Sequence, residues 1–238
     1  MQRIFLLIGL VIPVGHEAKA ATHAELLWVV DNSGSMLRFQ KELGTAIDGF
    51  FDALKAERVE WNLTLVSSSR TTQANAYRIS SLETAPGKAF RRYLKEIGVH
   101  GDVEEEFARP ALAHLPPADP FQLLAFVFFT DQVSDAGSQA VCASRFLSQV
   151  YQKWEVVNVL TQSFVASAEF ACVPSEGTAK GDTYRGSFFH HVNRHTGGTA
   201  YPRCGSSDAG GLKKSLQDAA RRIAERAREV ANWRRPDR

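Results

Sequence analysis

The chain has 238 residues, of which 44% are hydrophobic and 23% are charged, and its formal net charge is +2. This composition is that of an ordinary globular protein, and the length suits one sizeable core. A nearly neutral chain gives no indication of nucleic-acid binding, because that function needs a strongly basic surface. We therefore expect a single folded domain.

The first twenty residues have the pattern of a secretory signal peptide. Arg3 supplies a positive start, residues 4–14 are apolar, and Ala18-Lys19-Ala20 is a small-x-small cleavage signature. A membrane anchor would need about twenty apolar residues, and a proline and a glycine interrupt this stretch early. We expect a signal peptide at 1–20, a domain at 21–238, no membrane span in the mature chain, and a secreted or periplasmic protein.

An unbroken apolar run at 26–30 ends abruptly in Asp31-Asn32-Ser33-Gly34-Ser35. A run of this kind is typical of a strand buried on both faces of a parallel sheet. The polar residues that follow it would therefore lie at the carboxyl end of a buried strand.

The rest of the chain alternates helical and strand patterns. Apolar residues at helical spacing or helix-start signals predict helices at 36–56, 86–97, from Asp102 onward, 138–152, 184–195 and from Asp208 to about Asn232. Further strands are expected at 60–66, 76–82, 121–129, 155–160 and 199–203. Strands separated by helices predict an α/β fold with a doubly wound, mostly parallel six-stranded sheet and helices on both faces.

A second strand also ends at an aspartate, since the apolar run 121–129 is followed by Thr130-Asp131. Ligands of an open α/β sheet bind outside the carboxyl ends of its strands, so Asp131 is expected at the same edge as Asp31. Asp31, Ser33 and Ser35 alternate in an extended turn, which lets their side chains converge, and Gly34 permits a tight backbone path. The alternative is that Asp31 and the serines cap the next helix.

Carboxylate and hydroxyl oxygens are hard ligands, which suit Mg²⁺, Ca²⁺ or Mn²⁺ rather than zinc or copper. Mg²⁺ takes six oxygens, and two hydroxyls with one or two carboxylates leave at least one position open. An aspartate or glutamate of a protein partner can fill it. The pattern therefore predicts an adhesive metal site.

These residues resemble the metal-ion-dependent adhesion site of von Willebrand factor type A (VWA) domains. The order of elements also fits, and Thr196-Gly197-Gly198 is similar to a triplet that precedes the last strand in many members. The resemblance covers nearly all of 21–238 and implies a Rossmann-like VWA fold. It also implies the metal ligands Asp31, Ser33, Ser35 and Asp131, the last acting directly or through water.

The chain departs from the family at one ligand. VWA domains carry a threonine in a loop before the most apolar strand, whereas residues 98–102 occupy that place here without one. Asp102 could substitute and would make the site more suited to Ca²⁺, or it could be a plain helix cap. Thr71 or Thr72 could serve only if the loop assignment is wrong.

The cysteines Cys142, Cys172 and Cys204 would fall in a compartment where disulfides persist. Cys172 and Cys204 each follow a strand near one sheet edge, and the resemblance to bacterial secreted VWA proteins favours this pair. Cys142 would then be a small buried hydrophobe in its helix. A Cys142–Cys172 pair is the alternative.

Two weaker patterns are interpreted as solvated helix faces. His191 and His195 have a spacing that can bind zinc, but no third ligand accompanies them at a convincing distance. The closing helix carries several arginines that could meet an acidic partner or anionic lipid, with glutamates interspersed.

The sequence as a whole predicts a secreted binding module, not an enzyme, which captures a protein partner through a divalent cation. One alternative is a metal-assisted hydrolase at the same edge, with His100 as the only histidine near it. The other is a VWA scaffold that has lost the metal.

Overall fold

The computed structural model describes residues 22–68, 76–101, 107–130, 139–165, 188–202 and 209–233. Within these ranges six strands form one sheet in the order β3-β2-β1-β4-β5-β6, and every neighbouring pair is parallel except β2 with the edge strand β3. The strands are β1 (Thr22–Val30), β2 (Val59–Ser67), β3 (Tyr77–Ser80), β4 (Leu123–Thr130), β5 (Val159–Val165) and β6 (Thr199–Pro202). The expected doubly wound sheet is confirmed.

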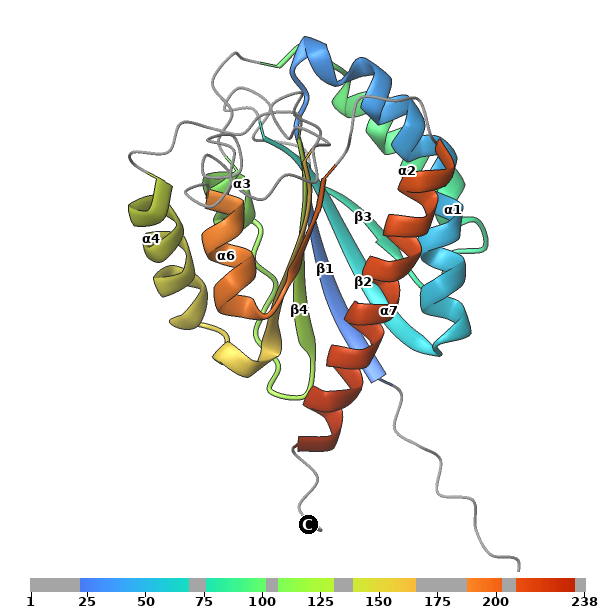
Figure 1. Cartoon of the computed structure of the whole chain (residues 1–238). Helices are drawn as coiled ribbons and strands as arrows, with labels where there is room; N and C mark the ends of the chain where they lie inside the picture. Colours follow the sequence, from blue (N-terminus) through green and yellow to red (C-terminus); the bar gives the residue numbers. More distant parts are fainter. Residues whose placement is uncertain are drawn as a thin grey trace, which may run out of the picture.

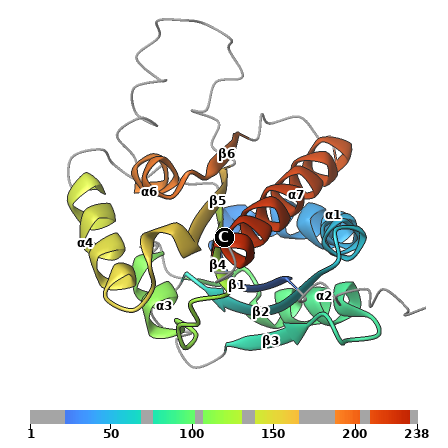
Figure 2. The same cartoon turned by 90° about the horizontal axis from the view of Figure 1, so that it is seen from below.

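Helices cover both faces of this sheet (Figure 1). One face carries α1 (Leu37–Ala56), α2 (Pro86–Ile97) and α7 (Ala209–Trp233), and the other carries α3 (Ala108–Ala113), α4 (Gln139–Tyr151) and α6 (Phe188–Thr196). Seen along the strands, the sheet runs between these two layers (Figure 2). Short 3-10 turns, η1 (Gly34–Met36) and η2 (Val156–Asn158), precede α1 and β5.

The central strand β1 is buried on both faces because successive side chains point to opposite sides. Trp28 and Val30 belong to the apolar cluster under α1 and α7, whereas Leu27 and Val29 belong to the cluster under α4 and α6. From Leu26 to Val30 every residue is buried on one face or the other, which is why this part of the strand shows a continuous apolar run, whereas His23 and Glu25 near its start are partly exposed.

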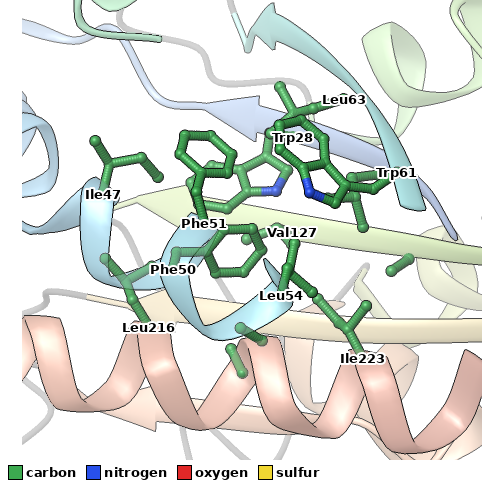
Figure 3. Close-up of a cluster of buried hydrophobic side chains, with 14 of the residues drawn as sticks. Trp28, Ile47, Phe50, Phe51, Leu54, Trp61, Leu63, Val127, Leu216 and Ile223 are labelled. Atoms are coloured by element: carbon green, nitrogen blue, oxygen red, sulfur yellow. The ribbon is translucent and has the colours of Figure 1, made fainter. Parts of the chain in front are cut away.

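The cluster under α1 and α7 is rich in aromatic rings (Figure 3). Trp28 meets Phe50 and Phe90 edge to face, with ring centroids 5.1 and 5.3 Å apart, and Phe51 stacks on Trp61 at 4.8 Å. Edge-to-face and offset-stacked contacts are the preferred arrangements of such rings. They fix α1 against β1 and hence fix the turn that joins them.

Two expectations about this fold are wrong. The strand expected at 155–160 begins later: Val156–Asn158 form the turn η2, where buried Asn158 donates from Nδ2 to the Pro120 carbonyl at 2.9 Å, and β5 runs on to Val165. Cys142 is exposed on α4 rather than buried, and its thiol is free.

The glycine pair after α6 ends that helix as expected. Gly197 has a φ of +70°, a conformation that glycine adopts without strain. Gly198 passes so close to the β5 backbone at Thr161 that a Cβ atom there would overlap it. The pair therefore sets how α6 turns into the edge strand β6.

Both ends of the described chain lie at one end of the sheet (Figure 1). Thr22 begins β1 there, and α7 finishes at Trp233 beside the same end. Asp31 follows the opposite end of β1. No helix of the described residues is both long and apolar enough to cross a bilayer.

Candidate metal centre

Asp31 lies directly after β1 and is completely buried. Its backbone N–H donates to the Phe129 carbonyl at 2.8 Å, which continues the ladder between β1 and β4. Its carboxylate accepts hydrogen bonds from the Ser33 backbone N–H at 2.8 Å and from the Thr130 hydroxyl at 2.7 Å. Two elements of the sheet therefore hold the carboxylate in one orientation.

Among the described residues, the hydrogen-bond donors to the Asp31 carboxylate are neutral. It makes no ion pair with any residue that the structure describes. Burying a carboxylate without a counter-charge costs on the order of several kcal/mol. Two hydrogen bonds offset only part of this cost. The site is thus suited to a cation.

The hydroxyl groups of Ser33 and Ser35 lie next to each other, with their oxygens 3.0 Å apart. Ser33 is nearly buried and Ser35 is exposed, so the pair reaches from the carboxylate to the surface. In an octahedral site with Mg–O bonds of about 2.1 Å, neighbouring oxygens lie about 3.0 Å apart. This spacing is that of an ordinary hydrogen bond between the two hydroxyls, and it also allows both oxygens to bind the same ion.

Helix capping does not account for the two serines. Ser33 precedes η1 and Met36 precedes α1, and neither makes a side-chain capping bond. Asp31 accepts the N–H two residues on, as in an Asx turn, so its second role is to shape the loop. Both hydroxyls are therefore available as ligands.

Gln40 fastens the loop after β1 to the end of α2. Its Nε2 group donates to the Asp31 carbonyl at 3.0 Å and to the Gly98 carbonyl at 2.9 Å. Gly98 has a φ of +69°, which turns the chain after α2 toward the loop. Sequence reasoning missed this role, although a polar residue on the apolar stripe of α1 was a usable signal.

The segment after α2 closes over Asn32. Gly101 donates its N–H to the Asn32 carbonyl at 2.8 Å, and a Cβ atom at Gly101 would overlap the Asn32 side chain. His100, the histidine expected nearest to the site, is exposed. The loop that follows β1 is therefore held from two sides, by Gln40 and by Gly101.

Several residues with expected roles lie outside the described part of the chain, and their roles stay predictions. They are Thr71, Thr72, Asp102, Asp131, Cys172 and Cys204, together with the expected signal peptide. Thr130, whose hydroxyl holds Asp31, is the residue immediately before Asp131.

The histidine pair on α6 does not form a metal site with other described residues. His195 donates from Nδ1 to the His191 carbonyl at 2.8 Å, and His195 is exposed. Across the described ranges, no three His, Cys, Asp or Glu side chains come together. The candidate centre after β1 is of another kind, because its described oxygen ligands would be one carboxylate and two hydroxyls.

Comparisons of the sequence with protein-family models and with curated proteins give no match. Solved structures do match. A von Willebrand factor type A protein from Catenulispora acidiphila superposes with a TM-score of 0.54 and 12% identity over 86% of this chain and 43% of that one. The pilus adhesin SpaC from Lactobacillus rhamnosus GG, in an open conformation, gives a TM-score of 0.58 and 12% identity over 87% and 30%.

A variant of the PilB minor pilin from Streptococcus sanguinis gives a TM-score of 0.52 and 12% identity over 92% of this chain and 65% of that one. This chain spans less than two-thirds of the length of each of these three proteins. Similarity at such low identity concerns the fold. Together with the strand order, it shows that the chain has the Rossmann-like α/β fold of von Willebrand factor type A domains.

Proposed function

We propose that this chain is a binding module that captures a protein partner through a divalent cation, with Mg²⁺ as the preferred ion. Asp31, Ser33 and Ser35 would hold the ion, and Asp131 would join them directly or through water. The observation that carries this proposal is the buried Asp31 carboxylate, which has no cationic partner among the described residues and lies beside two hydroxyls 3.0 Å apart.

The described residues would divide the work between orientation and binding. The Thr130 hydroxyl and the Ser33 N–H orient the Asp31 carboxylate, and Gln40 keeps the loop in place. The ion, when bound, supplies an electrophilic centre with an open position for a partner's aspartate or glutamate. Because Ser33 and Ser35 are neutral, they would leave that positive charge largely uncompensated.

The names of two structurally similar proteins support a binding role outside the cell. SpaC is named a pilus adhesin, and PilB a minor pilin. The expected signal peptide leads to the same secreted or periplasmic location. We infer that adhesion, rather than catalysis, is the use of this site.

Calorimetric titration of metal-free protein with Mg²⁺, Mn²⁺ and Ca²⁺ tests the proposal. We expect Mg²⁺ and Mn²⁺ to bind more tightly than Ca²⁺; the reverse order would favour Asp102 as an additional ligand. The double change Ser33→Ala, Ser35→Ala should weaken Mg²⁺ binding by more than about tenfold, since even supporting residues of metal sites have effects of this size.

The matched control is Ser144→Ala, Ser148→Ala, which removes two exposed hydroxyls from α4 on the other side of the sheet. This variant should bind Mg²⁺ as the unmodified protein does. Absence of binding for all three ions would contradict the proposal, as would equal Mg²⁺ affinities in the two double variants.

A further inference from the structure

A groove of about 840 Å³ lies between α1 and α2 and begins beside the candidate metal centre. Gln40, which holds the Asp31 carbonyl, is one of its lining residues, and so are Gly98 and Val99 after α2. The two helices lie side by side in both views of the molecule (Figures 1 and 2). A partner bound at the metal centre would therefore meet this groove next.

The groove has an apolar surface. Leu37 lies at the end nearest the serines and is 48% exposed. The partly exposed Val99 lines the groove from the other side, next to the buried Leu94. Burial of an apolar side chain against this surface would stabilise a complex by removing both from water.

The described charged residues that line the groove are all basic. Lys41 and Lys95 are exposed and make no ion pair with any described residue. Arg91 is already engaged, because it donates to the Gly44 carbonyl at 3.2 Å and to Asp48 at 2.8 Å. Among its described lining residues there is no aspartate or glutamate. Two free lysines thus favour an acidic occupant.

The distance between the two charge sites suits a short extended peptide. Lys41 follows Ser35 by six residues, which is about 9 Å at the helical rise of about 1.5 Å per residue. Three residues of peptide in the extended polyproline II conformation span about 9 Å, and because this conformation repeats every three residues, its first and fourth side chains lie on the same face. Carboxylates at positions one and four of a peptide can therefore reach the metal centre and Lys41 together.

We propose that the groove binds an extended acidic segment of the partner protein. The first acidic residue meets the metal centre, the next side chain is apolar and packs on Leu37 and Val99, and the fourth is acidic and lies between Lys41 and Lys95. The first contact rests on the proposed function, whereas the apolar and lysine contacts depend on the groove alone. The inference specifies the sequence pattern of the partner.

The probe is a labelled tetrapeptide, blocked at both ends, with aspartate first, leucine second, serine third and glutamate fourth. Its affinity for the Mg²⁺-loaded protein is measured by fluorescence anisotropy. The change Lys41→Gln, Lys95→Gln should weaken binding about fivefold, which is the size expected for two exposed charge contacts. The effect should vanish for a peptide with glutamine in the fourth position, and in 1 M salt.

The matched control is Lys55→Gln, Lys88→Gln. It removes the same charge from the same two helices at exposed positions outside the groove. A second variant, Leu37→Ala, should lower the affinity for the leucine peptide more than the affinity for a peptide with alanine in the second position. Equal affinities of the two lysine variants, or no peptide binding at all, would overturn the inference.

Mg²⁺ titration of each variant separates this inference from the proposed function. Normal Mg²⁺ binding with no lysine effect overturns the groove and leaves the metal centre intact. If the unmodified protein does not bind Mg²⁺, the proposed metal centre is wrong. Peptide binding that depends on the two lysines and persists in the presence of a chelator would then still support the proposed groove contacts. Self-association that the groove-lysine change abolishes would mean that a second copy is the occupant, which also overturns the inference.

Discussion

Trp28 and Asp31 lie three residues apart at the end of β1, and both are completely buried, but their surroundings are opposite. Trp28 packs edge to face against Phe50 and Phe90. Asp31 is a carboxylate with two neutral hydrogen-bond donors. The apolar contacts of Trp28 stabilise the fold by themselves, whereas the carboxylate of Asp31 is costly to bury and would need a cation to offset that cost.

Residues that stabilise the fold and residues of the candidate site therefore lie only three positions apart at the end of β1. Leu26 to Val30 are buried apolar residues, whereas Asp31, Asn32 and Ser33 are polar residues at positions where burial is costly. Proteins commonly accept such costs at functional sites. Substitutions on the two sides of this boundary should therefore have opposite effects on stability and on metal binding.

The largest effect is expected on the apolar side. Trp28→Ala should lower the free energy of unfolding by about 3–5 kcal/mol, because it leaves a cavity beneath α1. Urea denaturation measures the loss, with Phe50→Leu as a milder variant in the same cluster in case the first does not fold. A loss below about 1 kcal/mol would mean that Trp28 is not the anchor described.

Asp31→Asn probes the polar side of the boundary. In metal-free protein the free energy of unfolding should change by less than about 1 kcal/mol, or rise, because the variant removes a buried charge. The asparagine oxygen can still accept from the Ser33 N–H, and its NH2 group can donate to the Thr130 hydroxyl in a reversed bond. Mg²⁺ at one hundred times its Kd should stabilise the unmodified protein by about 2.7 kcal/mol and leave the variant unchanged. Denaturation with and without Mg²⁺ measures both, and a strongly destabilised variant would contradict the contrast.

Gln40→Ala tests the link between the two sides. Two carbonyls would lose the donor that they share, at a cost of about 2 kcal/mol if they remain away from water. Mg²⁺ affinity should fall as well, because the loop loses its attachment to α2. The control Gln149→Ala, at an exposed site on α4, should stay within about 0.5 kcal/mol of the unmodified protein.

Asp218 offers the smallest effect and a useful counterpart to Asp31. It lies on α7, is partly exposed, and accepts hydrogen bonds from Tyr201 at 2.8 Å and Arg222 at 2.9 Å. Partial burial raises the pKa of its carboxyl, but the bonds from Arg222 and Tyr201 outweigh this and hold the pKa below its usual value. Burial, with the Asp218 bond next, raises the pKa of Tyr201.

A lowered carboxyl pKa in the folded state contributes stability above the unfolded pKa of about 3.9, and the contribution is lost as pH falls through the folded value. Asp218→Asn should therefore cost less than about 1 kcal/mol at pH 7, because solvent screens the pair, and still less at pH 3. Denaturation at the two pH values measures the difference. A larger cost at pH 3 than at pH 7 would contradict the assignment.

Much of this fold could be predicted because buried strands and helix ends have recognisable local sequence patterns. β1 and β4 read as continuous apolar runs, and Gly197 marks the end of α6. β5 was misplaced because Thr161, Gln162 and Ser163 are polar but completely buried in the strand. Sequence patterns cannot distinguish such residues from a loop without knowing what covers them.

The candidate site follows the same division. Asp31, Ser33 and Ser35 could be picked out because they are close in the chain and their spacing carries the chemistry. The contacts that hold Asp31 come from Gln40, nine positions away, and from Thr130, ninety-nine positions away. The pairing of β1 with β4 and the packing of α1 bring these contacts together.

The position of Thr22 and Trp233 at the end of the sheet opposite Asp31 has a practical meaning for how the site is presented. A molecule coupled to a surface or a scaffold through either of these positions would point the Asp31 edge outward, free of the support. A row of such molecules would display many copies of the edge in one direction, so that weak single contacts add up through multivalent binding.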